Sequence, residues 1–348
     1  MLASYHNHSS FSDGKGPIAE LLSHARSLGV GELGVSDHLT LHPSGQPVSW
    51  SMCPHRLGEY LREARGLASR SRSSGGPLLR VGLEVDWFDG QEGVIRETLA
   101  GLDLDFVIGG VHFVGEVAID SRRSIWERLT QGRVDEVFHG YWVGVRKMAQ
   151  SRLFGIVAHL DLPKKFGFSP RCDLSGVIDE TLDAIAEAGM VVELNTAGWY
   201  CPCREPYPGP SILRRCRARD IGVTISADAQ DPGHIVRDFA EAVGCLRSAG
   251  YDEVARFAEG RVRFESIDWL PKSPARSVRR RPSGRRGHGR RRRPAVAGSA
   301  RFPNRTGSSR TARRGGGSRP GSACRRFDVP PCRRSAARRW ILRCPERW

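Results

Sequence analysis

The stretch Phe106-Val-Ile-Gly-Gly-Val-His112 is a continuous run of apolar and small residues that ends on a histidine. Such a run does not alternate between apolar and polar residues, which is typical of a parallel strand buried on both faces. Six other segments repeat this plan, a short apolar run with a polar residue at or just after its end: residues 2–5, 32–36, 79–84, 155–159, 190–195 and 222–226. The repeat predicts seven parallel strands.

Amphipathic stretches lie between these runs, among them residues 18–27, 55–68, 134–150, 174–188 and 212–218. Strands that alternate with helices predict an α/β fold with a covered parallel sheet. About seven such units within some 270 residues fit a closed barrel of the TIM size class. A doubly wound open sheet is the competing architecture, but no GxGxxG motif follows the first run, which counts against a dinucleotide-binding fold.

The ends of the predicted strands carry imidazoles and carboxylates: His6, His8, Asp37, His38, Glu84, His112, His159 and Asp228. In a parallel barrel all the carboxyl ends of the strands open on one face. Lone pairs and like charges crowded in this way repel one another unless cations neutralise them, so the pattern predicts bound metal. Imidazole with carboxylate suits zinc, iron or manganese better than magnesium. Each residue alone is weak evidence, since a single buried histidine is more often a core residue and Asp37 could cap a helix.

The charge of the chain is divided unevenly. Residues 271–348 hold 25 of the 54 Lys and Arg but only two of the 38 acids, which leaves residues 1–270 with 29 basic and 36 acidic side chains and a balance of −7. The last segment is rich in Arg, Gly, Pro and Ser, and its low apolar content predicts a disordered basic tail. It is interpreted either as a nucleic-acid or acidic-partner arm or as a non-functional extension, for example one translated out of frame.

The remaining features favour a soluble, cytoplasmic protein. No run approaches the roughly 18–20 apolar residues of a membrane span, and the start of the chain lacks the pattern of a cleaved signal peptide. The nine cysteines form no CxxC pair, so we expect reduced thiols rather than a disulfide framework or a zinc ribbon.

Several motifs together resemble the polymerase-and-histidinol-phosphatase (PHP) superfamily, and most closely its PHP-type histidinol-phosphatases. They are His6-Asn-His8-Ser-Ser-Phe-Ser-Asp13, Val35-Ser-Asp37-His38, Gly82-Leu-Glu84, Gly110-Val-His112-Phe, Ala158-His159-Leu-Asp161, Glu193-Leu-Asn195 and Ser226-Ala-Asp228. The resemblance spans about residues 4–260 and leaves the basic tail without a counterpart. We therefore divide the chain into a PHP metallophosphoesterase barrel, residues 1–270, and the tail, residues 271–348.

The resemblance implies a distorted (β/α)7 TIM-like barrel with two or three divalent metal ions. It assigns one metal to His6, His8, Glu84 and Asp228, which are also taken as catalytic. Glu84 would bridge to a second metal held by His112 and His159, and a third would lie at His38 and Asp13. The family motif Ser-Asp-Ala-His here reads Ala227-Asp228-Ala-Gln230, so Gln230 replaces the expected third-metal histidine. An amide oxygen is a weaker ligand than imidazole for zinc-like ions, which puts the third site in question.

The implied reaction is the hydrolysis of L-histidinol phosphate to L-histidinol and phosphate in histidine biosynthesis, with a small phosphorylated metabolite as partner. Lys164 or Lys165 is expected to clamp the phosphate, although either could be a surface lysine. Asn195 is expected to contact substrate or to stabilise a turn, and Trp199, Tyr200 and Tyr207 form either a substrate wall or core. Two alternatives stay open. The barrel could act on another phosphomonoester, or it could be a degraded barrel whose basic tail binds nucleic acid.

Overall fold

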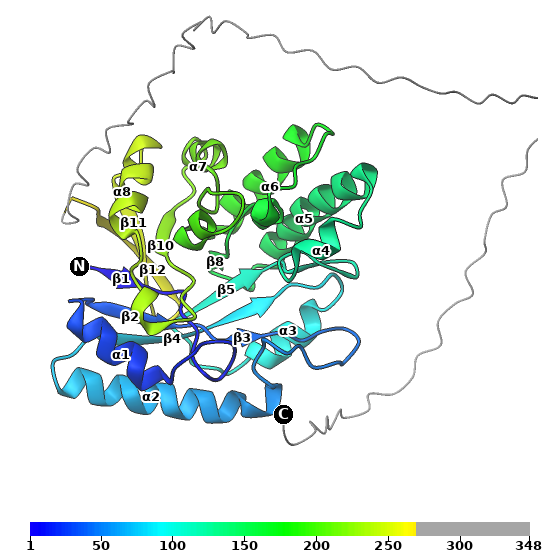
Figure 1. Cartoon of the computed structure of the whole chain (residues 1–348). Helices are drawn as coiled ribbons and strands as arrows, with labels where there is room; N and C mark the ends of the chain where they lie inside the picture. Colours follow the sequence, from blue (N-terminus) through cyan, green and yellow to red (C-terminus); the bar gives the residue numbers. More distant parts are fainter. Residues whose placement is uncertain (269–348) are drawn as a thin grey trace, which may run out of the picture. The chain divides into compact units, whose positions relative to one another are not determined.

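The structure, a computed structural model, describes residues 1–268, and its central feature is a parallel sheet that curves into a nearly closed barrel (Figure 1). Seven strands follow one another around it: β1 (Ala3–Ser4), β2 (Glu32–Val35), β4 (Leu78–Asp86), β5 (Phe106–Gly110), β8 (Ile156–Val157), β9 (Val191–Asn195) and β10 (Val223–Ser226). Six of the seven predicted runs contain one of these strands, and the seventh, residues 79–84, lies within β4. The predicted distorted (β/α)7 barrel is therefore confirmed, and the open sheet is not found.

The first and last strands meet just beyond their ends. Asn7 and Ala229 form a parallel bridge, in which the His8 amide donates to the Ala229 carbonyl at 2.9 Å and the Ala229 amide donates to the His6 carbonyl at 3.2 Å. The junction brings segments more than 200 residues apart into contact at the rim of the barrel.

A short strand extends the sheet on the same side as the rim. β3 (His38–Leu39) runs parallel to the second half of β4 and pairs His38 with Glu84. β2 pairs with the first half of β4, so β2 and β3 both pair with the same strand, one after the other along its length. This arrangement fixes the backbone of His38 directly beside that of Glu84.

Helices surround the strands (Figure 1): α1 (Ile18–Ser27), α2 (Leu57–Ser73), α3 (Glu92–Leu99), α4 (Arg123–Trp126), α5 (Gln131–Ser151), α6 (Ser175–Ala188), α7 (Pro210–Arg217) and α8 (Phe239–Ser248). α1 shows why these segments pack as helices against the sheet. Its apolar residues Ile18, Leu21 and Ala25 recur on one face of the helix and are fully buried. The Thr130 hydroxyl accepts a hydrogen bond from the Arg133 amide, so α5 begins one turn before the apolar pattern that predicted residues 134–150. Four 3-10 turns complete the connections: η1 (Pro54–Arg56), η2 (Leu162–Phe166), η3 (Thr196–Tyr200) and η4 (Pro232–His234).

Two hairpins were not predicted from the sequence. β6 (Phe113–Val114) and β7 (Val117–Ala118) rise beyond the end of β5, and β11 (Glu253–Ala258) and β12 (Arg261–Ser266) follow the last helix. Phe257 on β11 packs edge-on against Tyr5, with ring centroids 5.3 Å apart, and its amide donates to the Tyr5 hydroxyl. It belongs to a buried cluster with Ala255 of the same strand and with residues on or next to the barrel strands: Ala3, Tyr5, Phe106, Ile108, Ile156, Ala158 and Val191. The second hairpin therefore fills the barrel from the end opposite the rim.

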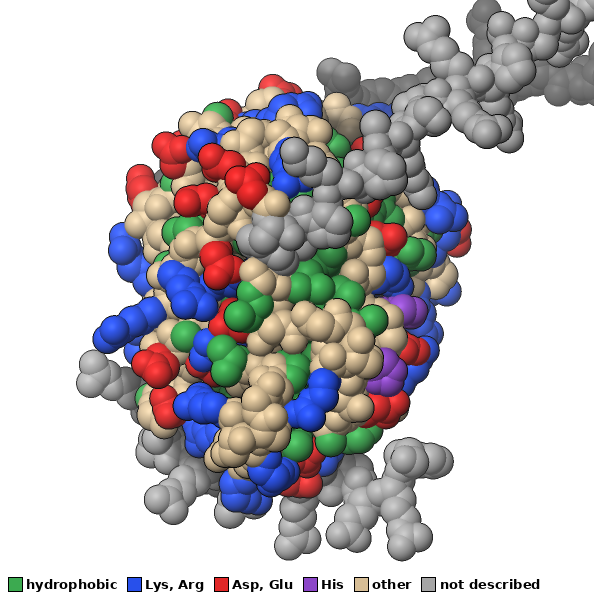
Figure 2. All heavy atoms as spheres, turned by 90° about the vertical axis from the view of Figure 1, so that its left-hand side faces the viewer, with side chains coloured by type: hydrophobic (Ala, Val, Ile, Leu, Met, Phe, Trp, Pro, Cys, Tyr) green, Lys and Arg blue, Asp and Glu red, His purple; other side chains and the backbone are tan. Residues whose placement is uncertain are grey.

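Charges of both signs mix on the surface formed by the described residues. On the face shown in Figure 2, Lys and Arg side chains interleave with Asp and Glu, in keeping with the near balance of charge in residues 1–270. No helix within residues 1–268 is both long enough and apolar enough to cross a membrane. The predicted tail, residues 271–348, lies outside the described residues.

Candidate metal centre

The carboxyl ends of the barrel strands surround a cavity of about 410 Å³. Its wall includes five of the predicted ligands, namely Asp13, His38, His112, His159 and Asp228, together with Gln230. His6, His8 and Glu84 lie just beneath and are almost completely buried. The predicted convergence of strand-end residues on one face is therefore what the structure contains.

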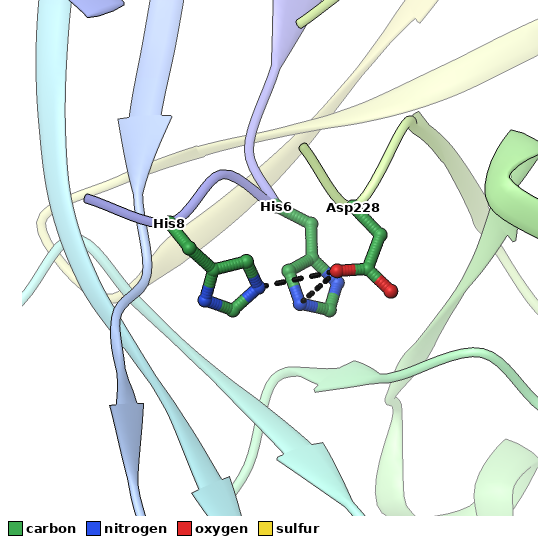
Figure 3. A group of neighbouring side chains, drawn as sticks. All are labelled: His6, His8 and Asp228. Carbon is green, nitrogen blue, oxygen red and sulfur yellow. Dashed lines mark hydrogen bonds and ion pairs between the residues drawn. The ribbon is translucent and has the colours of Figure 1, made fainter. Parts of the chain in front are cut away.

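One group of donors joins the first and last strands (Figure 3). His6 and His8 follow β1, and Asp228 follows β10. Asp228 Oδ1 lies 3.2 Å from His8 Nε2 and 3.6 Å from His6 Nε2. Residues 6 and 8 reach the same carboxylate because alternate residues of an extended chain point to one side. His6, His8 and Asp228 together can hold a cation.

Glu84 lies between this group and a second one. Its Oε2 is 3.0 Å from His6 Nε2, and its Oε1 is 3.1 Å from His159 Nε2. His112 Nε2 completes the second group, 3.1 Å from His159 Nε2 and 3.6 Å from Glu84 Oε1. Two imidazole nitrogens and a carboxylate oxygen aimed at one point form a donor set suited to a divalent cation. Glu84 thus lies between the two groups, and its bridging of two metals stays a prediction.

The third group is more open. Asp13 Oδ1 lies 3.7 Å from His8 Nδ1 and 3.9 Å from His38 Nε2. The loop that carries Asp13 packs closely on the barrel at Gly14, where a Cβ atom would lie only 2.2 Å from the His8 carbonyl oxygen. His8 was not predicted to contribute here, but in the structure it lies within reach of both this group and the first.

Gln230 faces this corner of the cavity and makes a contact that the sequence does not indicate. Its side-chain Nε2 donates a hydrogen bond of 2.9 Å to Asp228 Oδ1, the same oxygen that faces His6 and His8. The amide thus supports the first group in this structure, and its predicted ligation of a third metal stays a prediction.

Two buried carboxylates that were not predicted from the sequence hold the histidines in place. Glu193 Oε2 accepts from His6 Nδ1 at 2.8 Å, and its Oε1 accepts from the His159 backbone amide at 2.6 Å. Asp86 Oδ1 accepts from His112 Nδ1 at 2.5 Å. A carboxylate on the far nitrogen fixes the tautomer and the direction of an imidazole ligand. The detectable signal was an acid two residues from a donor on the same strand, since Asp86 follows Glu84 and Glu193 precedes Asn195.

Asp37 also has a different role from the one expected. Instead of capping a helix, its carboxylate accepts from the amides and hydroxyls of Ser9 and Ser12. These four hydrogen bonds fix the loop between His8 and Asp13. The Asp37 carboxylate therefore helps to place a predicted ligand although it is not in the cavity wall.

The electrostatics of the protein without metal show how strongly the groups are coupled. Burial lowers the pKa of His6, but the carboxylates of Glu193 and Glu84 outweigh burial and raise it well above its usual value. Burial raises the pKa of Glu84, and the imidazoles of His38 and His6 bring it well below its usual value. The His6 imidazole therefore holds a proton between two carboxylates, in a place where a bound cation can supply the positive charge instead.

The backbone is unusual at the rim. His159 has φ of 23° and Asp228 has φ of 48°, in a region that residues with a side chain seldom adopt. Strain of this kind persists where the surroundings over-determine it, typically at functional sites. Both residues line the cavity at the carboxyl ends of the strands.

The donor atoms fit a metal centre. The Nδ1 atoms of His8, His38 and His159 are buried without a hydrogen-bond partner among the described residues. His38 Nδ1 is within 2.8 Å of Glu84 Oε2 but lacks hydrogen-bond geometry. Buried polar atoms are rarely left unsatisfied, so His8 Nδ1, which faces Asp13 in the third group, indicates a ligand at that position.

The two predicted phosphate clamps are separated by the structure. Lys165 lines the cavity, and its Nζ is 3.6 Å from Asp120 Oδ2. The Nζ of Lys164 instead donates to Asp161 at 2.9 Å and to the Pro206 carbonyl at 2.8 Å, and it is not in the cavity wall. Of the two lysines, only Lys165 is in a position to meet a ligand in the cavity.

Asn195 is fully buried at the end of β9. Its Nδ2 donates to Glu193 Oε1 at 2.8 Å and to Asp228 Oδ2 at 3.3 Å, while its Oδ1 accepts from the Ala197 amide. These contacts correspond to the turn-stabilising interpretation of the sequence, and they also hold Asp228 from behind. Of the three aromatic residues considered as a substrate wall, Tyr207 lines the cavity.

Comparisons with known proteins agree with this geometry. Residues 4–197 match the PHP domain family. A Deinococcus radiodurans protein named "Probable histidinol-phosphatase" is 32% identical over 235 residues, which cover 68% of this chain and 88% of that protein. The histidinol-phosphatase of Bacillus subtilis is 25% identical over 245 residues, which cover 63% of this chain and 88% of that protein.

A solved structure has the same fold. Histidinol phosphate phosphatase from Lactococcus lactis, complexed with Zn, L-histidinol and phosphate, matches with a TM-score of 0.64 at 20% identity, over 75% of this chain and 98% of that one. The likeness covers nearly the whole of that protein and supports the assignment of the barrel.

Proposed function

The chain belongs to the PHP domain family, and we propose that it hydrolyses L-histidinol phosphate to L-histidinol and phosphate, a step of histidine biosynthesis. The observation that carries the proposal is the cluster of imidazoles and carboxylates centred on Glu84 at the mouth of the barrel. The relatives named histidinol-phosphatase support this substrate.

The proposed ligands fall into three sets. His6, His8, Asp228 and Glu84 hold one divalent metal, and Glu84 with His112 and His159 holds a second. His38 and Asp13 belong to a third position. Bound divalent metals supply positive charge to the phosphate oxygens and acidify the water that attacks phosphorus.

The side chains of the protein supply orientation and charge around that chemistry. Glu193 and Asp86 keep His6 and His112 pointed into the cavity through hydrogen bonds to their far nitrogens. Lys165 is proposed to bind a phosphate oxygen as a point charge, since its ammonium lines the same cavity. Burial of the donors beneath the cavity keeps bulk water away from the charges and strengthens their interactions.

We propose that this centre holds two or three divalent metal ions, with zinc, manganese or iron as candidates. The third position lacks an imidazole at residue 230, where the amide of Gln230 is directed to Asp228. Gln230→His should add about one metal equivalent per chain, measured by elemental analysis after gel filtration. Gln150→His, at an exposed site on α5, is the matched control. Unchanged metal content in Gln230→His would contradict a deficit at this position.

Turnover tests the function directly. The purified chain, supplied with manganese or zinc, should release inorganic phosphate from L-histidinol phosphate, and Glu84→Ala should abolish this release. A wild-type rate no higher than that of Glu84→Ala would reject the proposal. A panel of phosphate esters assayed in parallel would reveal preference for another phosphomonoester, which is the alternative substrate class.

The substrate class implies a small phosphorylated metabolite as partner and a cytoplasmic location, where such intermediates are made. Nucleic acid is not expected to bind the barrel, because acidic residues exceed basic ones in residues 1–270.

A further inference from the structure

Two charged side chains line the cavity besides the donors of the three proposed metal groups. They are Lys165 and Asp120, and they come from different parts of the fold, η2 and the segment that follows the β6–β7 hairpin. The proposed function gives Lys165 a phosphate to bind. It leaves the carboxylate of Asp120 without a use.

The backbone of the residue just before Asp120 is held by two hydrogen bonds. The Ile119 amide donates to the carbonyl of His112 at 2.9 Å, and the Ile119 carbonyl accepts from the Trp126 indole at 2.8 Å. Ile119 and Trp126 are both fully buried. Asp120 is therefore carried on a rigid connection that starts from a proposed metal ligand, and its side chain is one-quarter exposed, toward the cavity.

The contact between Asp120 and Lys165 leaves both charged groups able to bind a ligand. Their oxygen and nitrogen are 3.6 Å apart, which is beyond hydrogen-bond length. A carboxylate at this place repels a phosphate dianion, so on phosphate binding alone it is a disadvantage. The presence of the Asp120 carboxylate is explained if the ligand carries a positive charge close to the phosphate group.

We propose that Asp120 binds the ammonium group of the substrate, so that the cavity selects phosphate monoesters of small amino alcohols. The inference rests on the proposed function and extends it to the origin of specificity. In such an ester two carbon atoms separate the nitrogen from the ester oxygen, so its cation must lie near its anion. Adjacent acidic and basic side chains match this pair of charges. Trp50 and Tyr207, which line the same cavity, offer aromatic surface for the remainder of the substrate.

The competing explanation is that Asp120 only positions the Lys165 ammonium for phosphate. The two roles differ in which substrates they affect. A group that binds the ammonium acts only on esters that have one, whereas a group that positions Lys165 acts on every phosphate ester alike.

The experiment compares two substrates in the metal-loaded full-length protein: L-histidinol phosphate and 3-(imidazol-4-yl)propyl phosphate, which lacks the amine. Asp120→Asn, nearly equal in shape, is compared with the wild type and with Asp89→Asn, which makes the same change in an exposed ion pair with Lys147 on α5. Metal content is measured for each variant. We expect Asp120→Asn to lower the ratio of kcat/KM between the two esters by about tenfold, mainly through KM, as for the loss of a charge-assisted hydrogen bond. Asp89→Asn should leave the ratio at the wild-type value.

Equal losses for both esters in Asp120→Asn, or an unchanged ratio, would overturn the proposal. If the wild type hydrolyses neither ester, the proposed function fails, but the assignment of Asp120 is still decided by calorimetric binding of the same two esters. A wild-type preference for the amine-bearing ester that disappears in Asp120→Asn would then support it, and equal affinities in the wild type would refute it.

Discussion

At the scale of single residues, the centre depends on a few carboxylates that each serve more than one neighbour. Glu84 has one oxygen toward His6 and the other toward His159, so a single side chain couples two donor groups. Glu193 is placed one layer further out, between His6 and the backbone of His159. Loss of either carboxylate should therefore affect more than one contact.

The substitution Glu193→Gln tests whether this carboxylate holds the proposed metal ligands in place. An amide cannot accept on both of its terminal atoms, so either His6 Nδ1 or the His159 amide loses its acceptor. We expect metal affinity, measured by titration of the metal-free protein, to fall by about 10–100-fold. Glu187→Gln, at an exposed position on α6, is the control and should bind metal as the wild type does. Wild-type affinity in Glu193→Gln would contradict the role given to this residue.

Proton release provides a second test at this scale. Burial lowers the pKa of His112, but Asp86 and Asp120 raise it to about 10 in the metal-free protein. At neutral pH the imidazole therefore holds a proton that a bound cation must displace. Zinc added in weak buffer at pH 7 should release at least one proton per metal, and apparent affinity should increase as the pH rises toward 10. An indicator dye measures the release.

The same measurement on Asp86→Asn supplies the control. Without this carboxylate the pKa of His112 falls and fewer protons are displaced at pH 7. Zinc binding without proton release in the wild type would show that the imidazole is already neutral.

At the scale of elements, the barrel is completed by pieces outside the repeating strand–helix plan. β3 extends the sheet along β4 and carries His38, and the β6–β7 hairpin carries the chain from His112 to Asp120. The β11–β12 hairpin fills the opposite end with Phe257, which is 4% exposed. The site at one end of the barrel and the core at the other end are thus both completed by segments added to the repeating strand–helix units.

Phe257→Ala measures what the second hairpin contributes. Removal of a buried ring leaves a cavity among Tyr5, Phe106 and their neighbours, and we expect the free energy of unfolding in denaturant to fall by about 3–5 kcal/mol. Phe264→Ala, on the paired strand but 48% exposed, should cost about 1 kcal/mol or less. Similar losses in the two variants would show that the hairpin does not fill the core.

At the scale of the whole molecule, the residues of the cavity, the donor groups and the outer carboxylates all lie before residue 231. The predicted basic tail begins at residue 271. The proposed hydrolysis should therefore be a property of the barrel alone.

A chain that stops after residue 270 tests this division. It should release phosphate from L-histidinol phosphate with kcat/KM within about twofold of the full-length protein, because every cavity residue within the described part of the chain is kept. The same pair of proteins tests the alternative role of the tail. Salt-sensitive, sequence-independent DNA binding by the full chain that is lost on truncation would support a nucleic-acid arm. A large loss of phosphatase activity would contradict the division into barrel and tail.

The sequence by itself determined the seven strands and most of the donors, because both depend on local order. Continuous apolar runs mark buried parallel strands, and a parallel barrel places every residue that follows such a run on one face. His6, His8, His112 and Asp228 could be selected in this way without knowing which would be neighbours.

Only the tertiary structure decided which groups share a cation and which serve another purpose. Glu84 is central because β3 pairs beside it, Gln230 donates to Asp228 because the first and last strands meet, and Lys165 rather than Lys164 faces the cavity because Asp161 and Pro206 hold the other lysine. Each of these contacts joins segments brought together by closure of the barrel or by a turn. These contacts depend on how the chain folds, so no periodic pattern in the sequence predicts them.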